Sequence, residues 1–205
     1  MISTQIIGLS IFFIVFAPIL VAQTDYLKQT VGVGVGVGAP LGMFGETFEI
    51  FKNAPGVQVE YGYRLHRNLQ ADVGFESVIN GWNTSNVCQS PDSPATNAEY
   101  MIPFGGRGIL PLNGGKVLLS LGGGGAYLKY TSPCIYDNGN RFVLSQNVGW
   151  GGYVLGAASV VVDKAQRFRV GFVTRYYRAG TETLVSGAHR KDRWLNVYGE
   201  FSFSF

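Results

Sequence analysis

Apolar residues alternate with small or polar residues along much of this chain, and this alternation constrains the fold more than any other feature. The clearest case is VGVGVGVG at 31–38, where four valines are separated by glycines. A period of two places successive side chains on opposite faces of a β-strand. Beyond residue 22, no stretch of the sequence keeps a helical period. We therefore predict an all-β protein.

Eight segments carry the alternation, and turn-forming residues separate them. The expected strands are 31–38, 57–66, 69–76, 100–110, 117–130, 148–162, 168–176 and 195–205. Pro103 interrupts the fourth segment and indicates an edge or a bulge there, because proline cannot donate a ladder hydrogen bond.

The connections between these segments alternate between short and long. Short turns are expected at 66–68, 113–115 and 163–166, and longer loops at 40–55, 78–99, 131–146 and 179–192. Short turns at one end and long loops at the other are typical of an up-and-down barrel with two unlike rims. The sequence thus predicts an eight-stranded antiparallel up-and-down barrel.

The polar face of the strands is too poor in charge for a surface that meets water. Charged residues are 14% of the chain, against about 25% in ordinary soluble domains. Small residues, such as Ser120, Gly122, Gly124 and Ala126, suit the narrow lumen of an eight-stranded barrel. The apolar face is then expected to meet lipid, which makes the barrel transmembrane and disfavours a soluble secreted barrel.

Aromatic residues near the strand ends are expected to form girdles at the lipid headgroups. They are Tyr61, Tyr63, Tyr127, Trp150, Tyr176 and Trp194.

Eight charged residues fall on the polar face, four of each sign. The acids are Glu60, Asp72, Glu76 and Glu200, and the bases are Arg64, Arg107, Arg169 and Arg175. Buried charges are tolerated when they are paired and hydrogen-bonded. We predict a charge network within the lumen; the alternative is a set of solvated surface pairs, which are common and weak.

The N-terminal segment is apolar and uncharged from residue 6 to residue 22. This composition predicts a signal peptide over 1–22, with cleavage after Ala22, and a barrel domain over 23–205. The alternative is an uncleaved anchor helix, since a helical span needs about 20 apolar residues.

The chain resembles the small bacterial outer-membrane β-barrels of the OmpA/OmpX-like family over essentially all of residues 23–205. The ending YGEFSFSF resembles the signal read by the barrel-assembly machinery, and PFGGRGILPL and LSLGGGGAYLKY resemble the glycine-rich hairpin of that superfamily. The resemblance implies location in the outer membrane and assigns the assembly signal to alternating positions. These are Val197, Gly199, Phe201, Phe203 and Phe205.

No catalytic or metal-binding motif stands out in the sequence. Glu182, Ser186 and His189 lie close together in the sequence and could form a serine, histidine and acid set. Without a further motif, we interpret them as ordinary loop residues. Two cysteines and two histidines, widely spread, do not have the spacing of a metal site. We expect no enzymatic activity, no metal and no cofactor.

Two features of the long loops predict contacts outside the lumen. Cys88 and Cys134 fall in loops that rise from neighbouring strands, so we expect a disulfide between them; the alternative is two free thiols. Arg190, Lys191 and Arg193 are placed to bind lipopolysaccharide phosphates at the outer rim, or are simply solvated.

The function expected from the sequence is that of a monomeric outer-membrane barrel with a largely filled lumen and a structural or surface-interaction role. The expected partners are membrane lipids, including lipopolysaccharide, and the assembly machinery. A net charge of +3, spread along the chain, gives no indication of nucleic-acid binding. The alternatives are a narrow pore or carrier for small or apolar solutes, and a lipid-modifying enzyme.

Overall fold

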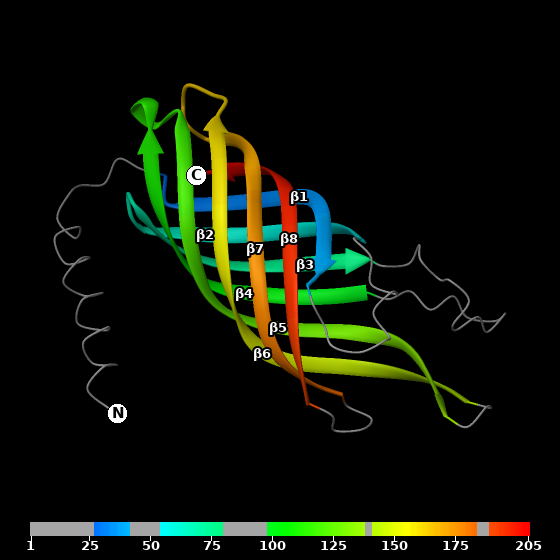
Figure 1. The fold of residues 1–205 in the computed structure, drawn as a ribbon. Coiled ribbons are helices and arrows are strands. Elements are labelled where there is room, and N and C mark those ends of the chain that lie inside the picture. Colours follow the sequence, from blue (N-terminus) through cyan, green and yellow to red (C-terminus); the bar gives the residue numbers. More distant parts are fainter. Residues whose placement is uncertain (1–26, 42–53, 80–97, 138–140, 184–188) are drawn as a thin grey trace, which may run out of the picture.

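The computed structural model describes residues 27–41, 54–79, 98–137, 141–183 and 189–205 (Figure 1). These residues form eight antiparallel strands that close into one barrel, in which each strand pairs with its sequence neighbours and the first with the last. The strands are β1 (Gln29–Pro40), β2 (Ala54–His66), β3 (Leu69–Ile79), β4 (Ala98–Leu112), β5 (Val117–Asp137), β6 (Arg141–Val161), β7 (Phe168–Thr183) and β8 (His189–Ser204). The predicted eight-stranded up-and-down barrel is confirmed.

The barrel is closed where the two ends of the described chain meet. Gln29 and Phe205 exchange two backbone hydrogen bonds, each 2.9 Å long, and β1 and β8 pair from there to Pro40 and Trp194. Closure leaves no strand edge unpaired, which a lipid environment requires because it offers the backbone no hydrogen-bonding partner. Among the described residues, no helix is long and apolar enough to cross a membrane.

Three short connections lie at the same end of the barrel as Gln29 and Phe205, and we call this the short-turn end. They are residues 67–68, the short 3-10 turn η3 (Asn113–Gly115) with Lys116, and residues 162–167. Asn113, Gly114 and Gly115 have φ angles of 49°, 66° and 85°. Glycine adopts this left-handed region without steric cost, and asparagine tolerates it better than most residues. We call the opposite end the long-loop end.

Two of the four predicted long loops are wrong. The β5–β6 ladder continues to the pair Asp137 and Arg141, and the β7–β8 ladder continues to Glu182 and His189. Most of 131–146 and 179–192 is therefore strand. Figure 1 shows the ends of β5 and β6 reaching past the other strands. Strands that extend beyond the lipid have no face that must be apolar, so the alternation used to predict them stops early.

The expectation of an edge or a bulge at Pro103 is also wrong. Pro103 lies in β4, which is paired on both sides, and it opposes Ala126 of β5. On the other side of β4, the ladder with β3 keeps one register. It has no paired residues between the pair Val73 and Phe104 and the pair Glu76 and Met101. A gap in one ladder accommodates the missing N–H of the proline without a change of register.

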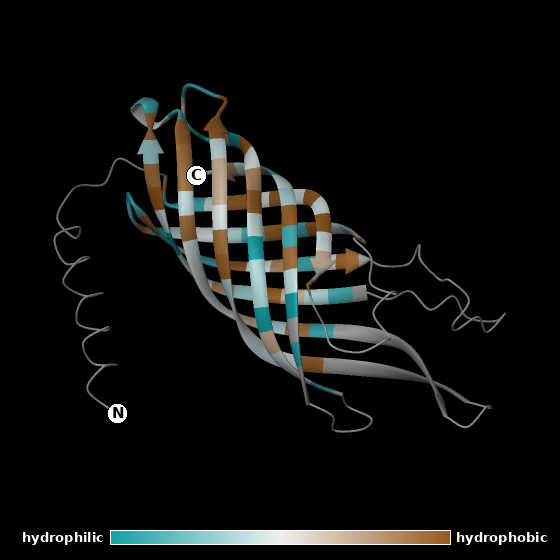
Figure 2. Ribbon diagram, in the orientation of Figure 1, coloured by the Kyte–Doolittle hydropathy of each residue, from teal (hydrophilic) through white to brown (hydrophobic). Residues whose placement is uncertain are grey.

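The exterior of the barrel is an apolar surface, which Figure 2 shows as brown bands alternating with white and teal along the strands. Large apolar side chains remain exposed there, for example Leu121 at 76% and Val35 at 69%. A continuous apolar exterior of this kind is not stable in water and is typical of a surface that contacts lipid.

Candidate functional site

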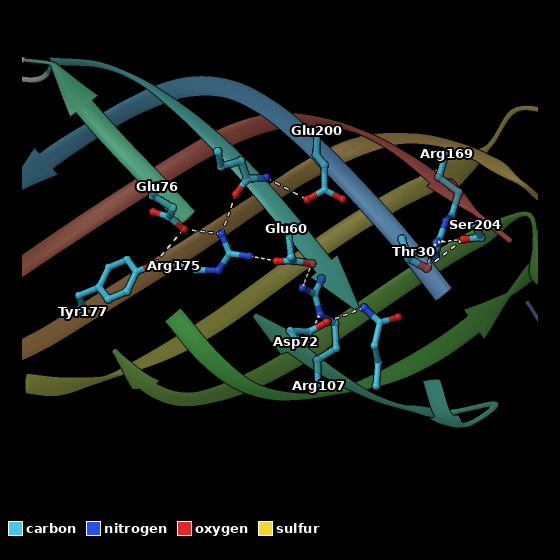
Figure 3. Close-up of polar contacts among 12 residues, drawn as sticks. Thr30, Glu60, Asp72, Glu76, Arg107, Arg169, Arg175, Tyr177, Glu200 and Ser204 are labelled. Carbon is cyan, nitrogen blue, oxygen red and sulfur yellow. Dashed lines mark hydrogen bonds and ion pairs between the residues drawn. The ribbon is translucent and has the colours of Figure 1, made fainter. Parts of the chain in front are cut away.

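The bore of the barrel contains a cluster of ion pairs built around Glu60 of β2. Its carboxylate contacts two guanidinium groups, those of Arg107 on β4 and Arg175 on β7. Arg107 also pairs with Asp72 of β3 at 2.7 Å, and Arg175 also pairs with Glu76 of β3. All five side chains are at most 7% exposed. We call these five residues the bore cluster; Figure 3 shows the chain of contacts from Glu76 to Asp72.

Neutral side chains complete the hydrogen bonding of the bore cluster. Gln58 accepts from Arg175 at 2.6 Å and donates to Glu200 at 2.9 Å. Gln70 donates to Asp72 at 2.6 Å. The carboxylate of Glu76 accepts further hydrogen bonds from three side chains of β7 and β8: Tyr177 at 2.8 Å, Asn196 at 2.6 Å and Tyr198 at 3.2 Å. Shared hydrogen bonds of this kind make buried charges tolerable.

Beside the bore cluster and from there toward the long-loop end, the interior is packed with apolar and aromatic side chains. This apolar layer comes from β4 to β8 and consists of Met101, Ala126, Leu128, Tyr153, Leu155, Val173, Tyr177, Ala179, Trp194 and Tyr198. Ala126, Val173, Tyr177 and Tyr198 are completely buried. The lumen is thus filled by charge pairs at its middle and by apolar packing beyond them.

Of the eight charged residues expected in the lumen, the structure brings five together in the bore cluster. Glu200 lies beside it and is held through Gln58 rather than through an arginine at ion-pair distance. Arg169 lies nearer the short-turn end, where it donates to the hydroxyls of Thr30 and Ser204 instead of to a carboxylate. Arg64, half-buried on β2, lines a cavity at that same end.

Sequence reasoning missed the neutral partners of the charges. Gln58, Asn196 and Tyr198 stand at interior positions of the alternation, next to the acids and arginines that were identified. Tyr177 lies one residue beyond the predicted end of its strand, at the next interior position after Arg175. Assigning every second residue of each strand to the interior, and extending β7 by one residue, would have placed all four side chains in the lumen.

The prediction of outward-facing aromatic residues is wrong for Trp194. This side chain is 1% exposed and belongs to the apolar layer, whereas Trp150 is 65% exposed on the exterior. Trp150 lies edge-on to Phe104 and Tyr127, with ring centroids 6.2 and 5.2 Å apart. Trp194 shares the interior parity of Asn196, and this parity, not its place near a strand end, sets its direction.

The remaining predicted residues are placed as follows. Glu182 and His189 oppose each other in β7 and β8, and Ser186 lies outside the described residues. Cys88 also lies outside them; Cys134 is in β5 rather than in a loop, and its side chain is not among those described. In the described part of the chain, no group of three or more His, Cys, Asp or Glu is placed to hold a metal ion.

The residues of the expected assembly signal all fall on the outer face of the barrel's last strand or directly after it. Val197, Phe201 and Phe205 are 37–50% exposed, and Phe203 stacks against Phe205 with ring centroids 5.9 Å apart. The predicted signal peptide, 1–22, lies outside the described residues.

Fold, filled lumen and apolar exterior together define the class of this protein: a small membrane-spanning β-barrel of the bacterial outer-membrane type. No protein-family model and no curated protein sequence match the chain. Solved structures do match its fold.

Neisserial surface protein A superposes with a TM-score of 0.61 at 15% identity, over 86% of this chain and 97% of that one. Ail, the attachment invasion locus protein of Yersinia pestis, superposes with a TM-score of 0.52 at 11% identity, over 86% of this chain and 99% of that one. Ail in complex with the heparin analogue sucrose octasulfate gives 0.54 at 12% identity. At these identities the similarity shows the fold.

Proposed function

We propose that this protein is a sealed outer-membrane barrel with a structural or surface-interaction role and no enzymatic activity. The observation that carries the proposal is the bore cluster, which links β2, β3, β4 and β7 across the lumen. An ion crossing the barrel must displace these pairs, and a buried charge left without its partner costs about 3–5 kcal/mol. The apolar layer adds a second barrier because it offers a permeating ion no polar partner.

Conductance of the purified protein in planar bilayers tests this proposal against the alternative of a narrow pore. We expect a barrel that shifts on unheated gels but passes no discrete current. The variant Arg175→Ala with Glu76→Ala removes the central pair and is expected to raise conductance. The matched control, Arg178→Ala on the exterior, is expected to leave it unchanged. Discrete channels in the unmodified protein would contradict a sealed lumen.

The outer rim of β7 and β8 carries the basic residues that support lipopolysaccharide as a partner. Arg178 opposes Arg193 in register, and Lys191 opposes Gly180, with all three cations exposed. Like charges placed directly opposite each other are destabilising unless an anion lies between them. The phosphates of lipopolysaccharide would supply that anion in the outer leaflet. The side chain of Arg190 is not among those described.

Thermal unfolding with and without lipopolysaccharide tests this partner. We expect lipopolysaccharide to raise the unfolding temperature of the unmodified protein, and Arg178→Gln with Arg193→Gln to lose most of that increase. Lys28→Gln, at the short-turn end, is the control and is expected to retain it. An increase of the same size in both variants would contradict binding at this rim.

A further inference from the structure

A cavity of about 700 Å³ opens at the short-turn end of the bore. We call it the vestibule. Four cationic side chains line it, Arg64, Arg67, Lys164 and Arg169, and among the described residues no aspartate or glutamate belongs to the lining. The cations come from β2, β7 and the two turns at 67–68 and 162–167, so they surround the cavity from different sides.

Arg169 is the deepest of these cations and is only 6% exposed. Its guanidinium donates to Thr30 Oγ1 at 2.9 Å and to Ser204 Oγ, while its Nε has no hydrogen-bond partner among the described residues (Figure 3). No carboxylate in that part of the chain forms an ion pair with it, whereas Arg107 and Arg175 contact two carboxylates each. A buried guanidinium without a counter-charge is costly.

The acids nearest to the vestibule are already engaged elsewhere. Asp163 follows β6 in the same turn as Lys164, but its carboxylate accepts the backbone N–H of Phe168 at 2.7 Å. Asp72 is paired with Arg107. Glu200 lines the same inner cavity as Arg169 and accepts from the neutral Gln58, but it does not reach ion-pair distance of Arg169. A counter-charge in direct contact with Arg169 would therefore come from outside the described part of the barrel.

We propose that the vestibule binds the phosphate group of a small organic phosphoester. Guanidinium groups match phosphate oxygens with paired hydrogen bonds, and lysine adds a mobile point charge. Ile109 and Leu118 lie in the same lining and give the organic part of the ligand an apolar wall. The volume lies within the range of small-molecule sites. The phosphate belongs either to a phospholipid headgroup of the adjacent leaflet or to a soluble phosphoester.

Calorimetric titration of the purified protein in an uncharged detergent at low salt tests the proposal and separates the two sources. The soluble probe is glycerol 3-phosphate, the lipid probe is dihexanoyl phosphatidylglycerol below its micelle concentration, and glycerol is the neutral control. Binding of glycerol 3-phosphate alone supports a soluble ligand. Binding of the lipid probe alone, or of both probes, supports recognition of a phosphate that a headgroup can supply. Binding of neither overturns the proposal.

The contribution of the vestibule cations to binding is tested with two sets of variants, one at the turn residues and one at the buried Arg169. Arg67→Gln with Lys164→Gln changes only turn residues and is expected to weaken binding about tenfold or more, since a hydrogen bond to a charged group contributes that much. Arg169→Gln is expected to do the same, and Arg169→Lys to recover part of the loss. Lys129→Gln, on the exterior of β5 and away from both proposed phosphate sites, is the control. Unchanged affinity in the turn variant would overturn the assignment to the vestibule, whether or not the barrel conducts.

Discussion

Arg175 on β7 and Glu76 on β3 form an ion pair across the interior of the barrel, although 99 positions separate them in sequence. Neither residue has its charge neutralised by an adjacent strand. The pair therefore forms only when the barrel is closed. The charges of Arg175 and Glu76 are neutralised only in the closed barrel.

Removing one member of this pair is expected to destabilise the barrel strongly. Arg175→Met leaves Glu76 and one oxygen of Glu60 without their cation, and Glu76→Gln leaves Arg175 with one carboxylate instead of two. We expect the free energy of unfolding to fall by about 3–5 kcal/mol for Arg175→Met, because an uncompensated buried charge remains. Urea-induced unfolding in lipid or detergent measures it.

The double variant, Arg175→Met with Glu76→Gln, separates coupling from general loss of packing. We expect its destabilisation to be clearly smaller than the sum of the two single effects, since the second change removes a charge that the first left unpaired. Arg193→Gln on the exterior is expected to change the free energy of unfolding by less than about 0.5 kcal/mol. Additive effects of the two interior changes would contradict the coupling.

Two strand glycines, Gly124 and Gly180, are expected to respond oppositely to alanine. A Cβ on Gly124 of β5 would lie 2.6 Å from Cα of Gly105 on β4 and closer still to the carbonyl oxygen of Phe104. A Cβ on Gly180 of β7 would meet nothing within 4 Å. We expect Gly124→Ala to lower the free energy of unfolding by about 1–3 kcal/mol, because backbone must move.

Gly180→Ala serves as the matched control for that strand contact. The substitution lowers the conformational entropy of the unfolded chain and causes no clash in the folded barrel. We expect it to leave the free energy of unfolding unchanged or to raise it by up to about 1 kcal/mol. Equal losses in the two variants would show that close strand approach at Gly124 is not the cause.

The alternation of side chains was sufficient to predict the barrel and its strand number. Of the eight charged residues expected in the lumen, six are buried, and Arg64 and Glu200 are half-buried. The prediction succeeded because one face meets lipid and the other fills a narrow bore, so the pattern is strict wherever the strand is within the membrane. It failed from 131 to 146, where the strands continue beyond that constraint.

The pairing inside the bore was not predictable in the same way. No feature of the sequence indicated that Arg169 would meet hydroxyls rather than Glu200, because that depends on which residues lie at the same height in the closed barrel. Trp194 was misplaced for a different reason: a rule about strand ends was preferred over parity. Register across strands far apart in sequence decides the pairing of Arg169, and a single sequence does not specify it, whereas the direction of Trp194 follows from the alternation within β8.

The opposite directions of Trp150 and Trp194 are expected to be visible in fluorescence. In a Trp82→Phe background, brominated lipid should quench a protein that retains only Trp150 much more strongly than one that retains only Trp194. Trp150 is exposed on the apolar exterior, and Trp194 is enclosed in the apolar layer. Similar quenching of the two single-tryptophan variants would contradict the inward placement of Trp194.

Phe205 is expected to contribute to assembly in cells more than to folding in detergent. It is half-exposed and terminal, and its backbone closes the barrel through Gln29, a contact that Phe205→Ala preserves. Phe205→Ala should therefore refold with a normal heat shift but accumulate more slowly in outer membranes. Phe172→Ala, another outward phenylalanine at 56% exposure, is the control. Equal accumulation of both variants would count against an assembly signal at the terminus.

Protonation of Asp163 is expected to loosen the turn between β6 and β7. Desolvation is the largest single influence on the pKa of this carboxyl and raises it. Hydrogen bonds from the backbone N–H groups of Phe168, Arg167 and Ala165 together outweigh desolvation and hold the pKa below its ordinary value of 3.8. A depressed pKa in the folded state means that the carboxylate stabilises the turn fully above that ordinary value. The contribution is lost as the pH falls through the folded pKa.

Hydrogen exchange at the Phe168 amide, normalised to its intrinsic rate, measures this effect between pH 6 and pH 2. Protection of that amide should be constant above about pH 5 and decrease toward pH 2, because the hydrogen bond of 2.7 Å to Asp163 weakens when the acceptor is neutral. Asp163→Asn keeps an oxygen acceptor but cannot titrate, so its protection should be lower and independent of pH over the same range. A titrating profile in the Asp163→Asn variant would assign the effect to another group.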